Sequence, residues 1–369
     1  MKKRIKVCSR CVMDSDIPDI VFDSNGICNY CSEFLDRNNN FLQKSKKEDL
    51  DKLIGNIKRS GKGKRYDCVV GVSGGVDSSW VLVSALKNGL RPLAVHMDNG
   101  WNSELAQNNI ANLLKKLNVD LHTHVIDWEE YRSLMQAFFD ADVVDVELLY
   151  DNAMLAVNYQ AAKKFNIKYI LSGNNAATEG MKMPNGWNHL KFDKKNIQAI
   201  ARIKKGAKIK TFPAIGTLDR FIFEYILNKK WTDFLDYTDY NKDKAMSVLE
   251  SDFAYKPYPY KHYESVFTRF YQGYILPEKF GIDKRKVHFS NLIITNQMTR
   301  DDAIEKLKEI PYPSKEDLLE DIEYFLKKMN WNKQDLENYI GRSEKLHSEY
   351  PNEKRFWNFA KKIHGLIFR

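Results

Sequence analysis

The chain has 369 residues, of which 43% are hydrophobic and 12% aromatic, so it is long enough for two globular domains with real cores. Its 58 basic and 49 acidic residues leave a net charge of +9, which favours an anionic ligand: a nucleotide, a sugar nucleotide or RNA. No apolar run approaches the roughly 18 residues of a membrane helix, and no apolar segment follows the basic start of the chain, which excludes a secretory signal. We therefore expect a cytoplasmic protein without a membrane partner.

Four of the five cysteines lie near the start of the chain in two pairs. Cys8 and Cys11 form the first Cys-x2-Cys pair, and Cys28 and Cys31 form the second. Each pair places two thiolates on one tight turn, and two such turns close a tetrahedral site with four sulfur ligands. Because cytosolic thiols stay reduced, disulfides are not expected. The pattern predicts a structural metal, with zinc as first choice and an iron–sulfur cluster as second, in a module over residues 1–40.

The region after this module begins with a lysine-rich amphipathic stretch, which predicts a helix that ends at Gly61. Short apolar runs then alternate with helical patterns as far as residue 215. The expected strands are residues 67–72, 91–98, 120–127 and 167–175. This alternation is typical of a sheet whose strands are parallel and whose two faces are both covered by helices. We predict an α/β domain with a doubly wound parallel sheet over residues 41–215.

The last third of the chain lacks a strand signal, and its patterns all favour helices. The expected helices are residues 218–230, 241–253, 264–276, 285–297, 299–310 and 314–329. Thr299 and Ser314 are suitable N-terminal caps for the last two. We predict a helical region over residues 216–369 that binds the substrate or a partner.

The first expected strand ends in the sequence SGGVDSS, residues 73–79, directly before a helix. Two glycines let the backbone approach a ligand closely, and the unpaired amides of the following helix bind phosphate oxygens. An ordinary glycine turn would not need the surrounding hydroxyls, and no Gly-x4-Gly-Lys-Ser/Thr sequence occurs, which excludes a Walker loop. The predicted ATP-binding residues are Val72, Ser73, Gly74, Gly75, Asp77, Ser78 and Ser79, with Asp98 and Gly173 from the ends of two other strands.

The string Ser-Gly-Gly-x-Asp-Ser resembles the pyrophosphate loop of the PP-loop ATP pyrophosphatases, whose fold is of the adenine nucleotide alpha hydrolase-like type. The resemblance implies transfer of AMP from ATP to a carbonyl-type oxygen, with release of pyrophosphate. The segment SGNNAATEG, residues 172–180, resembles a segment of NAD synthetase, which implies that Asp77 and Glu179 share Mg²⁺. The sequence departs from that segment at Asn174, Asn175 and Ala176, so these residues are not given the synthetase roles. Asn174 and Asn175 are predicted to bind the substrate.

Three further features indicate one particular family among the PP-loop enzymes. They are the cysteine pairs, the segment MKMPNGWNHLK at 181–191, and the block at 261–303. Together they resemble the N-acetyl sugar amidotransferases of bacterial surface polysaccharide biosynthesis, including lipopolysaccharide O-antigen. That family implies an enzyme that converts the N-acetyl group of an activated sugar into an acetamidino group with ATP and ammonia. The implied partner is a separate glutaminase with a barrel subunit like that of histidine biosynthesis, because this chain shows no glutaminase domain of its own.

The C-terminal block carries basic and aromatic residues suited to a sugar nucleotide. The predicted substrate-binding residues are Trp101, Asn174, Asn175, Lys261, Arg269, Lys284 and Arg285, and further candidates are Lys256, Tyr258, Tyr260 and Tyr271. Each also has a structural interpretation, since tyrosines at helical spacing often pack in a core and lysines are usually solvated. The predicted catalytic residues are Asp77 and Ser73 of the turn, with His262, Glu264 and His288 as candidates for proton transfer.

Two other interpretations stay open. A tRNA thiolation enzyme has the same loop and often a four-cysteine metal site, and the positive charge suits RNA. A persulfide-forming thiolase needs a reactive cysteine near ATP, whereas Cys68 lies within a strand as a small buried hydrophobe; a cluster-dependent thiolase escapes this objection. The second alternative is a zinc-ribbon binding module on an inactive nucleotide-binding domain, against which the intact Asp77 and Glu179 count. We expect no nucleic-acid partner.

Overall fold

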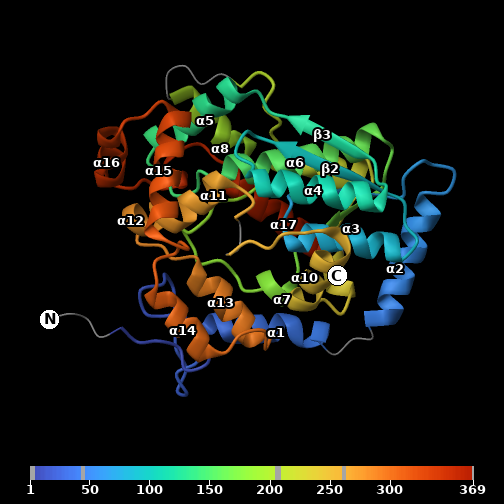
Figure 1. Cartoon of the computed structure of the whole chain (residues 1–369), viewed down its shortest axis with the longest axis horizontal. Coiled ribbons are helices and arrows are strands. Elements are labelled where there is room, and N and C mark those ends of the chain that lie inside the picture. The colour runs from blue at the N-terminus through green and yellow to red at the C-terminus, as the bar shows by residue number, and fades with distance from the viewer. Residues whose placement is uncertain (1–4, 43–45, 204–208, 260–262, 368–369) are drawn as a thin grey trace.

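The computed structural model describes residues 5–42, 46–203, 209–259 and 263–367 (Figure 1). It contains a five-stranded parallel sheet. The strands are β1 (Cys68–Gly71), β2 (Pro92–Asp98), β3 (Leu121–Val125), β4 (Tyr169–Ser172) and β5 (Lys230–Asp233). Their order across the sheet is β3-β2-β1-β4-β5, and every neighbouring pair is parallel. The doubly wound parallel sheet predicted from the alternating pattern is therefore confirmed.

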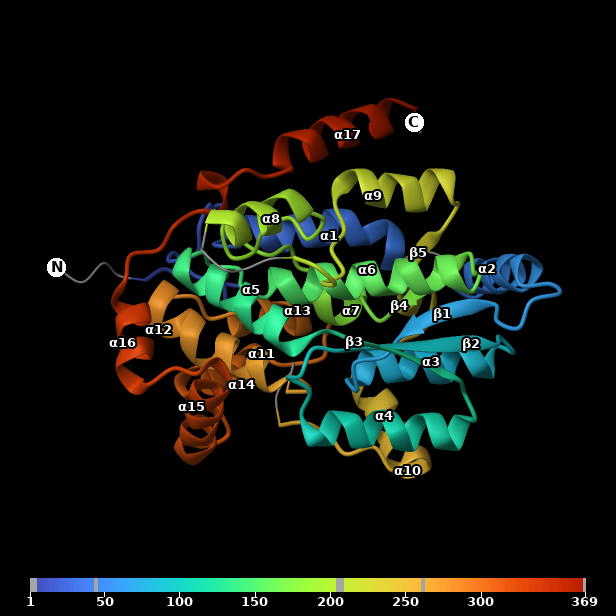
Figure 2. The same ribbon diagram turned by 90° about the horizontal axis from the view of Figure 1, so that it is seen from above.

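Helices cover both faces of this sheet. On one face α6 (Leu148–Lys164) packs against β1, β2 and β4, and on the other face α3 (Val76–Lys87) packs against the same strands (Figure 2). Beyond α3 lie α4 (Glu104–Leu117) and α10 (Lys242–Phe253). Successive residues of a strand point to opposite faces, so Val69 and Val70 of β1 belong to two separate apolar clusters. Burial on both faces explains why β1 reads as a continuous apolar run.

The remaining helices surround this core. Those before residue 230 are α1 (Asn29–Leu42), α2 (Lys46–Ser60), α5 (Trp128–Asp140), α7 (Ala176–Glu179), α8 (Lys194–Ile203), α9 (Thr217–Phe221) and the π-helical turn η1 (Ile222–Ile226). Those after it are η2 (Phe234–Tyr237), α11 (Val266–Phe270), η3 (Tyr271–Ile275), α12 (Leu276–Phe280), α13 (Arg285–Ile294), α14 (Arg300–Lys308), α15 (Lys315–Met329), α16 (Lys333–Gly341), η4 (His347–Glu349) and α17 (Lys354–Ile367). No helix among the described residues combines the length and the apolar composition needed to cross a bilayer.

The helical C-terminal region largely follows its sequence pattern, and both predicted caps are confirmed. The Thr299 side chain accepts a hydrogen bond from the Asp302 amide, and the Ser314 side chain accepts one from the Asp317 amide. The expectation that strands end before residue 215 is wrong, because β5 pairs with β4. The helix expected over 218–230 ends at Ile226, and Asn228, two residues later, has a φ of 50° in the left-handed region. A four-residue strand with partly exposed side chains gives neither an apolar run nor a clear alternation.

The N-terminal module also differs from its expected outline. The module was expected to end at residue 40, after the polar segment 36–40, but that segment is part of α1, and this helix continues to Leu42. The four cysteines belong to the same apolar cluster as buried residues of α5 and α6, so the module packs onto the main core.

Candidate functional site

The turn after β1 lies where the strand order of the sheet reverses, since β1 has β2 on one side and β4 on the other. Open α/β sheets bind ligands in the crevice at such a point, beyond the carboxyl ends of the strands. Gly74 has a φ of 86°, and a Cβ atom there would lie 2.8 Å from the carbonyl oxygen of Ala106. Helix α3 begins directly after Gly75, and within the described chain no side chain caps it. Its first amides are therefore oriented for an anion.

Two serine hydroxyls hold this turn in shape. The Ser73 and Ser78 hydroxyls lie 3.2 Å apart, and the Ser73 amide also donates to the Ser78 hydroxyl at 3.2 Å. The Ser78 hydroxyl donates to the Gly75 carbonyl, and the Gly75 amide donates to the Ser73 hydroxyl. Ser79 is buried, and its amide bonds to the Gly75 carbonyl. The hydroxyls expected to bind phosphate thus also organise the loop that would receive it.

Three tyrosines from beyond β5 close over the turn. The hydroxyls of Tyr255 and Tyr258 both donate to the Gly74 carbonyl, at 3.0 and 3.1 Å. The Tyr240 hydroxyl donates to the Asp77 carboxylate. Burial, and then the charge of Asp77, raise the pKa of Tyr240, so its hydroxyl keeps its proton and acts as a donor. Of these three residues only Tyr258 was a candidate from sequence.

Carboxylates gather beside the turn, on the side of β4 and β5. The charges of Asp77 and Glu179 both act on Tyr240, so the two predicted magnesium ligands lie near the same phenol. Burial, followed by the charges of Asp236 and Glu179, raises the pKa of Asp233 to about 6. The Oδ1 atom of Asp233 is buried and has no hydrogen-bond partner among the described residues. An unpartnered carboxylate oxygen beside further carboxylates fits a hard cation, so Asp77, Glu179 and Asp233 would hold Mg²⁺.

The segment after β4 approaches the turn closely. A Cβ atom on Gly173 would lie 3.0 Å from the Ser78 amide nitrogen. The Asn174 amide donates to the Ser172 hydroxyl, and the Asn175 side chain accepts from the Thr178 amide as the cap of α7. Asn175 is buried, so in this structure it orders the segment that carries Glu179. Substrate contact by Asn174 and Asn175 stays a prediction.

The end of β2 is tied to the same turn through a histidine. The Asn102 side-chain amide donates to Asp98 at 3.2 Å and lies 3.1 Å from His96 Nε2. Because an amide nitrogen only donates, Nε2 accepts, and His96 Nδ1 carries the proton that it donates to the Val72 carbonyl at 2.8 Å. The Gly100 amide also donates to Asp98, at 2.8 Å. Asp98 therefore lies in an ordered position at the sheet edge.

Glu264 brings the C-terminal region to this edge. Its Oε1 atom lies 3.4 Å from the place a Cβ of Gly75 would take, and its carbonyl accepts from the Ser103 amide at 2.9 Å. The Val266 amide donates to the Trp101 carbonyl at 2.9 Å. The indole of Trp101 is completely buried, with ring contacts to Phe267 and Phe325 among others, so it packs in the core. Substrate contact by Trp101 stays a prediction.

Comparisons with known proteins match two regions of the chain, one with the ATP turn and one that begins at Glu264. Residues 50–182 match the NAD synthase family, and residues 264–364 match the family described as "LPS biosynthesis protein WbpG-like, C-terminal domain". The chain thus combines a domain similar to NAD synthase, of the PP-loop type, with a WbpG-like C-terminal domain. The family resemblance inferred from the sequence is confirmed at this level. A PP-loop domain implies the use of ATP and Mg²⁺, and the WbpG-like domain indicates glycan biosynthesis.

Solved structures that match part of the chain include three enzymes or enzyme subunits. NMN synthetase from Francisella tularensis is 17% identical, with 60% of this chain and 100% of that chain covered and a TM-score of 0.30. NH3-dependent NAD synthetase from Campylobacter jejuni is 17% identical, with 56% and 84% covered and a TM-score of 0.30. A predicted subunit of tRNA methyltransferase from Methanocaldococcus jannaschii is 12% identical, with 50% and 73% covered and a TM-score of 0.29. The curated proteins gave no match.

The basic residues predicted to bind substrate in the WbpG-like domain have protein partners. The Arg269 guanidinium makes two hydrogen bonds to Asp321, at 2.6 and 2.5 Å. Arg285 pairs with Asp283, and Lys284 pairs with Glu147 at 2.7 Å. These pairs give all three a structural role in helix packing, and their contact with substrate stays a prediction.

Other candidates of this domain have mixed placements. Tyr271 is completely buried, and its hydroxyl donates to the Val144 carbonyl. His288 lies partly exposed on α13. The Lys256 backbone is tied to Asn109 of α4, beside Tyr258. Tyr260, Lys261 and His262 lie outside the described residues.

The cysteine quartet forms a closed site in the N-terminal segment, which lies beside α13 and α14 (Figure 1). The four sulfur atoms lie within 4.8 Å of one another; Cys8 and Cys31 are 3.9 Å apart, and Cys11 and Cys28 are 3.8 Å apart. A zinc–sulfur distance of about 2.3 Å gives sulfur separations of about 3.8 Å in a tetrahedral site. Arg300 of α14 donates to the Cys8 and Cys11 carbonyls. The geometry fits a structural metal that joins the N-terminal module to the WbpG-like domain.

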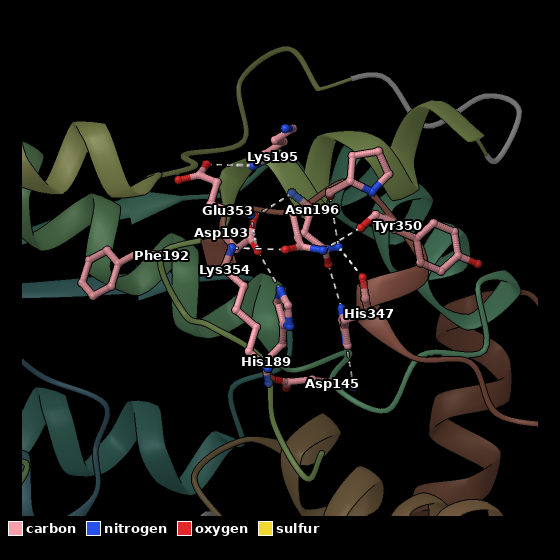
Figure 3. Close-up of polar contacts among 12 residues, drawn as sticks. Asp145, His189, Phe192, Asp193, Lys195, Asn196, His347, Tyr350, Glu353 and Lys354 are labelled. Carbon is pink, nitrogen blue, oxygen red and sulfur yellow. Dashed lines mark hydrogen bonds and ion pairs between the residues drawn. The ribbon is translucent and has the colours of Figure 1, made fainter. Parts of the chain in front are cut away.

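The end of the WbpG-like domain docks against residues 189–196 through a buried polar network (Figure 3). The rings of His189 and His347 stack at 4.4 Å, and His347 Nδ1 lies 2.7 Å from the Asn196 side-chain oxygen. His347 Nε2 accepts from the Asp145 amide at 3.2 Å. Burial, followed by the charge of His189, lowers the pKa of His347 to about 3, so this ring is neutral. Nothing in the spacing of the sequence predicted this network.

Proposed function

We propose that this chain is an ATP-dependent amidotransferase that acts on an N-acetyl sugar, activated as a sugar nucleotide, in the biosynthesis of surface polysaccharide. The reaction would adenylate the N-acetyl carbonyl oxygen and replace it with ammonia-derived nitrogen, giving an acetamidino sugar. The observation that supports this most directly is the place of Glu264. This residue begins the WbpG-like match and lies against Gly75 of the ATP turn. This position supports a site that the WbpG-like domain and the ATP turn build together. Because ATP is the proposed substrate, we expect the reaction to take place in the cytoplasm.

The chemistry needs activation because an amide carbonyl is a weak electrophile and its oxygen a poor leaving group. The carbonyl oxygen attacks the α-phosphorus of ATP, and pyrophosphate leaves. Ammonia then attacks the carbon, AMP departs with the former carbonyl oxygen, and the amidine remains. The amides after Gly75 would hold the departing pyrophosphate. Mg²⁺ at Asp77, Glu179 and Asp233 would supply charge neutralisation for the phosphates.

Proton transfer is assigned to Glu264. Ammonia that has added to the carbon must lose protons before the amidine forms, and a carboxylate at the ATP turn is placed for this task. The Glu264 backbone is fixed by the hydrogen bond to Ser103, so the side chain extends from an anchored segment. Ser73 and His288 remain candidates of lower priority, because Ser73 is engaged in the turn itself.

Ammonia supply is the second part of the proposal. Free ammonia at neutral pH is mostly ammonium, which has no lone pair for attack. We propose that a glutaminase subunit, with a barrel subunit like that of histidine biosynthesis, docks near the ATP edge and passes on neutral ammonia. The purified chain should then use high ammonium at alkaline pH and not glutamine. Efficient use of glutamine by the chain alone would refute this part.

Product analysis tests the main proposal. The chain is incubated with a UDP-N-acetyl sugar, MgATP and ammonium chloride, and the products are separated by mass spectrometry. The expected sugar product is lighter than the substrate by the difference between oxygen and NH, and AMP and pyrophosphate appear in equal amounts. Formation of ADP and orthophosphate would contradict adenylation. Thiolated tRNA in a parallel assay with a sulfur donor would favour the alternative enzyme.

The alternative function, tRNA thiolation, requires either a reactive cysteine or a metal cluster. Burial raises the pKa of Cys68, so its thiol stays protonated, and it is buried in β1. A thiolation enzyme would therefore depend on a cluster at Cys8, Cys11, Cys28 and Cys31. Iron and acid-labile sulfide in the purified protein would favour that enzyme, and zinc would favour the amidotransferase.

A further inference from the structure

The first turn of α6 lies at the same edge of the sheet as the ATP turn. Helix α6 leads into β4, and in a parallel sheet such a helix runs back against the strands, so it begins at their carboxyl ends. Tyr150 and Asp151 belong to this first turn. Burial, and then the charge of Glu264, raise the pKa of Tyr150. Tyr150 therefore lies within the electrostatic reach of the residue that contacts Gly75.

A lysine from a distant segment is fixed beside this turn. Lys191 Nζ lies 2.7 Å from Asp151 and 2.9 Å from Asp145. The Lys191 carbonyl accepts from the side chain of Asn152, which is fully buried in α6. Asp145 also accepts from the His189 amide at 2.6 Å, so the network with His347 orients the carboxylate that holds Lys191 (Figure 3).

These groups are partly accessible to solvent although protein surrounds them. The side chain of Asp145 is only 1% exposed, whereas those of Asp151 and Lys191 keep 30% and 28% exposure. Burial nevertheless has the largest single influence on the pKa of both residues. It raises the pKa of Asp151. It also opposes the charged form of Lys191, but the charges of Asp145 and Asp151 together outweigh it, so the pKa of Lys191 is raised. Groups that are surrounded by protein and still accessible to solvent lie in a recess.

The recess offers unused polar atoms. Asp151 bonds Lys191 through Oδ2, and its Oδ1 atom has no hydrogen-bond partner within the described part of the chain. The Tyr150 hydroxyl also has no hydrogen-bond partner within the described part of the chain, and Tyr150 as a residue is partly exposed. A carboxylate oxygen that accepts, an ammonium that donates and a phenol that does both match a ring with several hydroxyl groups.

The charge balance argues against a phosphate in this recess. Asp145, Glu147 and Asp151 supply three negative charges, while Lys191 and Lys284 supply two positive ones. The group therefore carries one net negative charge, which repels a diphosphate. A neutral ligand with hydroxyl groups avoids that repulsion.

We infer that Tyr150, Asp151 and Lys191 form the subsite for the sugar ring of the acceptor, with the hydroxyls of the ring bound in this recess and the acetamido group directed toward Glu264 and the ATP turn. The inference rests on the proposed function, because it names the part of the site that takes the sugar. It assigns the sugar to the edge of the PP-loop domain, and the WbpG-like domain supports that edge through His347 and Lys284.

Binding measurements test the subsite without turnover. The ligands are UDP-N-acetylglucosamine and N-acetylglucosamine methyl glycoside for the sugar, and MgATP for the nucleotide, each titrated by calorimetry or ligand-observed NMR. Tyr150→Phe removes a hydroxyl that bonds nothing in the described chain, so the fold should be unchanged. Asp151→Asn keeps the shape of the side chain and removes its charge. Lys163→Met, at the exposed far end of α6, is the control for Lys191→Met.

The expected result is specific to the sugar. Each of the three variants should raise the Kd for both sugar probes about tenfold, as expected for loss of a hydrogen bond in a recess, and change the Kd for MgATP less than twofold. Lys163→Met should bind like the unmodified chain. Thermal melting checks the fold of every variant.

The outcomes separate the two proposals. If the unmodified chain binds MgATP and neither sugar probe nor any other N-acetyl sugar nucleotide in a panel, the proposed function fails and this subsite with it. If the chain binds a sugar and folded Tyr150→Phe and Asp151→Asn bind it unchanged, the subsite is wrong while the proposed function stands.

Discussion

The ATP turn and the recess beside α6 face the same edge of the sheet and are built in opposite ways. The turn takes its shape from consecutive residues, with two glycines, three hydroxyls and the backbone amides of one helix. The recess takes its shape from charged side chains of separate segments, joined by hydrogen bonds between Asp145, Asp151 and Lys191. Backbone amides suit the fixed charge of a phosphate, whereas paired side chains suit hydroxyls. The comparison teaches that one site of this chain is encoded locally and the other by tertiary contacts.

The largest effect is expected at the ATP turn itself. Asp77→Ala should lower turnover at least a thousandfold, equivalent to about 4 kcal/mol of transition-state stabilisation, because it removes a charge that would hold Mg²⁺. It also removes the acceptor of the Tyr240 hydroxyl. The measurement is AMP release, with Asp51→Ala on the exposed face of α2 as the matched control. A folded Asp77→Ala variant with near-normal turnover would show that the turn does not carry the chemistry.

The cysteine site gives the next largest effect, and it concerns stability. Cys11→Ser should lower the free energy of unfolding by several kcal/mol, since a structural metal contributes directly to folding. The loss should be seen as a lower melting temperature and as reduced metal content by elemental analysis. Cys68→Ala is the control, because it removes a buried sulfur outside the quartet. Equal metal content in Cys11→Ser and the unmodified chain would contradict the site.

The cysteine site and the ATP turn could both be predicted because the residues of each lie close together in the sequence. The same applies to β1, β2 and β4, which lie in the interior of the sheet and read as apolar runs. Strand β5 could not be predicted, since its four residues are stabilised by pairing with β4 and not by their own pattern. Tyr240, Asp233 and Lys191 were missed for a related reason. These residues reach the site only through contacts between segments that are far apart in the chain. Such contacts cannot be inferred from the spacing of residues along the sequence.

The histidine network behind the recess should make stability depend on pH. His347 has a pKa near 3 in the folded chain, against an ordinary value of 6.5, so the unfolded chain binds more protons between these values. Stability is therefore full above pH 6.5 and falls as the pH drops toward 3, by roughly 2 kcal/mol between pH 7 and pH 5. His347→Gln should be less stable at pH 7 and show a flatter dependence over this range. Urea unfolding at each pH measures both, and identical slopes for the two proteins would contradict the assignment.

The smallest effect is expected where the ATP turn itself depends on tertiary contacts. Tyr255 and Tyr258 donate to the same Gly74 carbonyl, so Tyr255→Phe leaves that oxygen with one donor. A carbonyl with one remaining hydrogen bond loses little, and we expect an increase in the KM for ATP below about threefold, less than 1 kcal/mol. The double variant Tyr255→Phe, Tyr258→Phe leaves the buried Gly74 carbonyl without a tyrosine donor. It should raise the KM for ATP by more than the two single changes combined, because in each single variant the other tyrosine still donates to this carbonyl. Unchanged KM values in the single and double variants would show that the turn keeps its shape from its own residues alone, which would make the contrast between the turn and the recess complete.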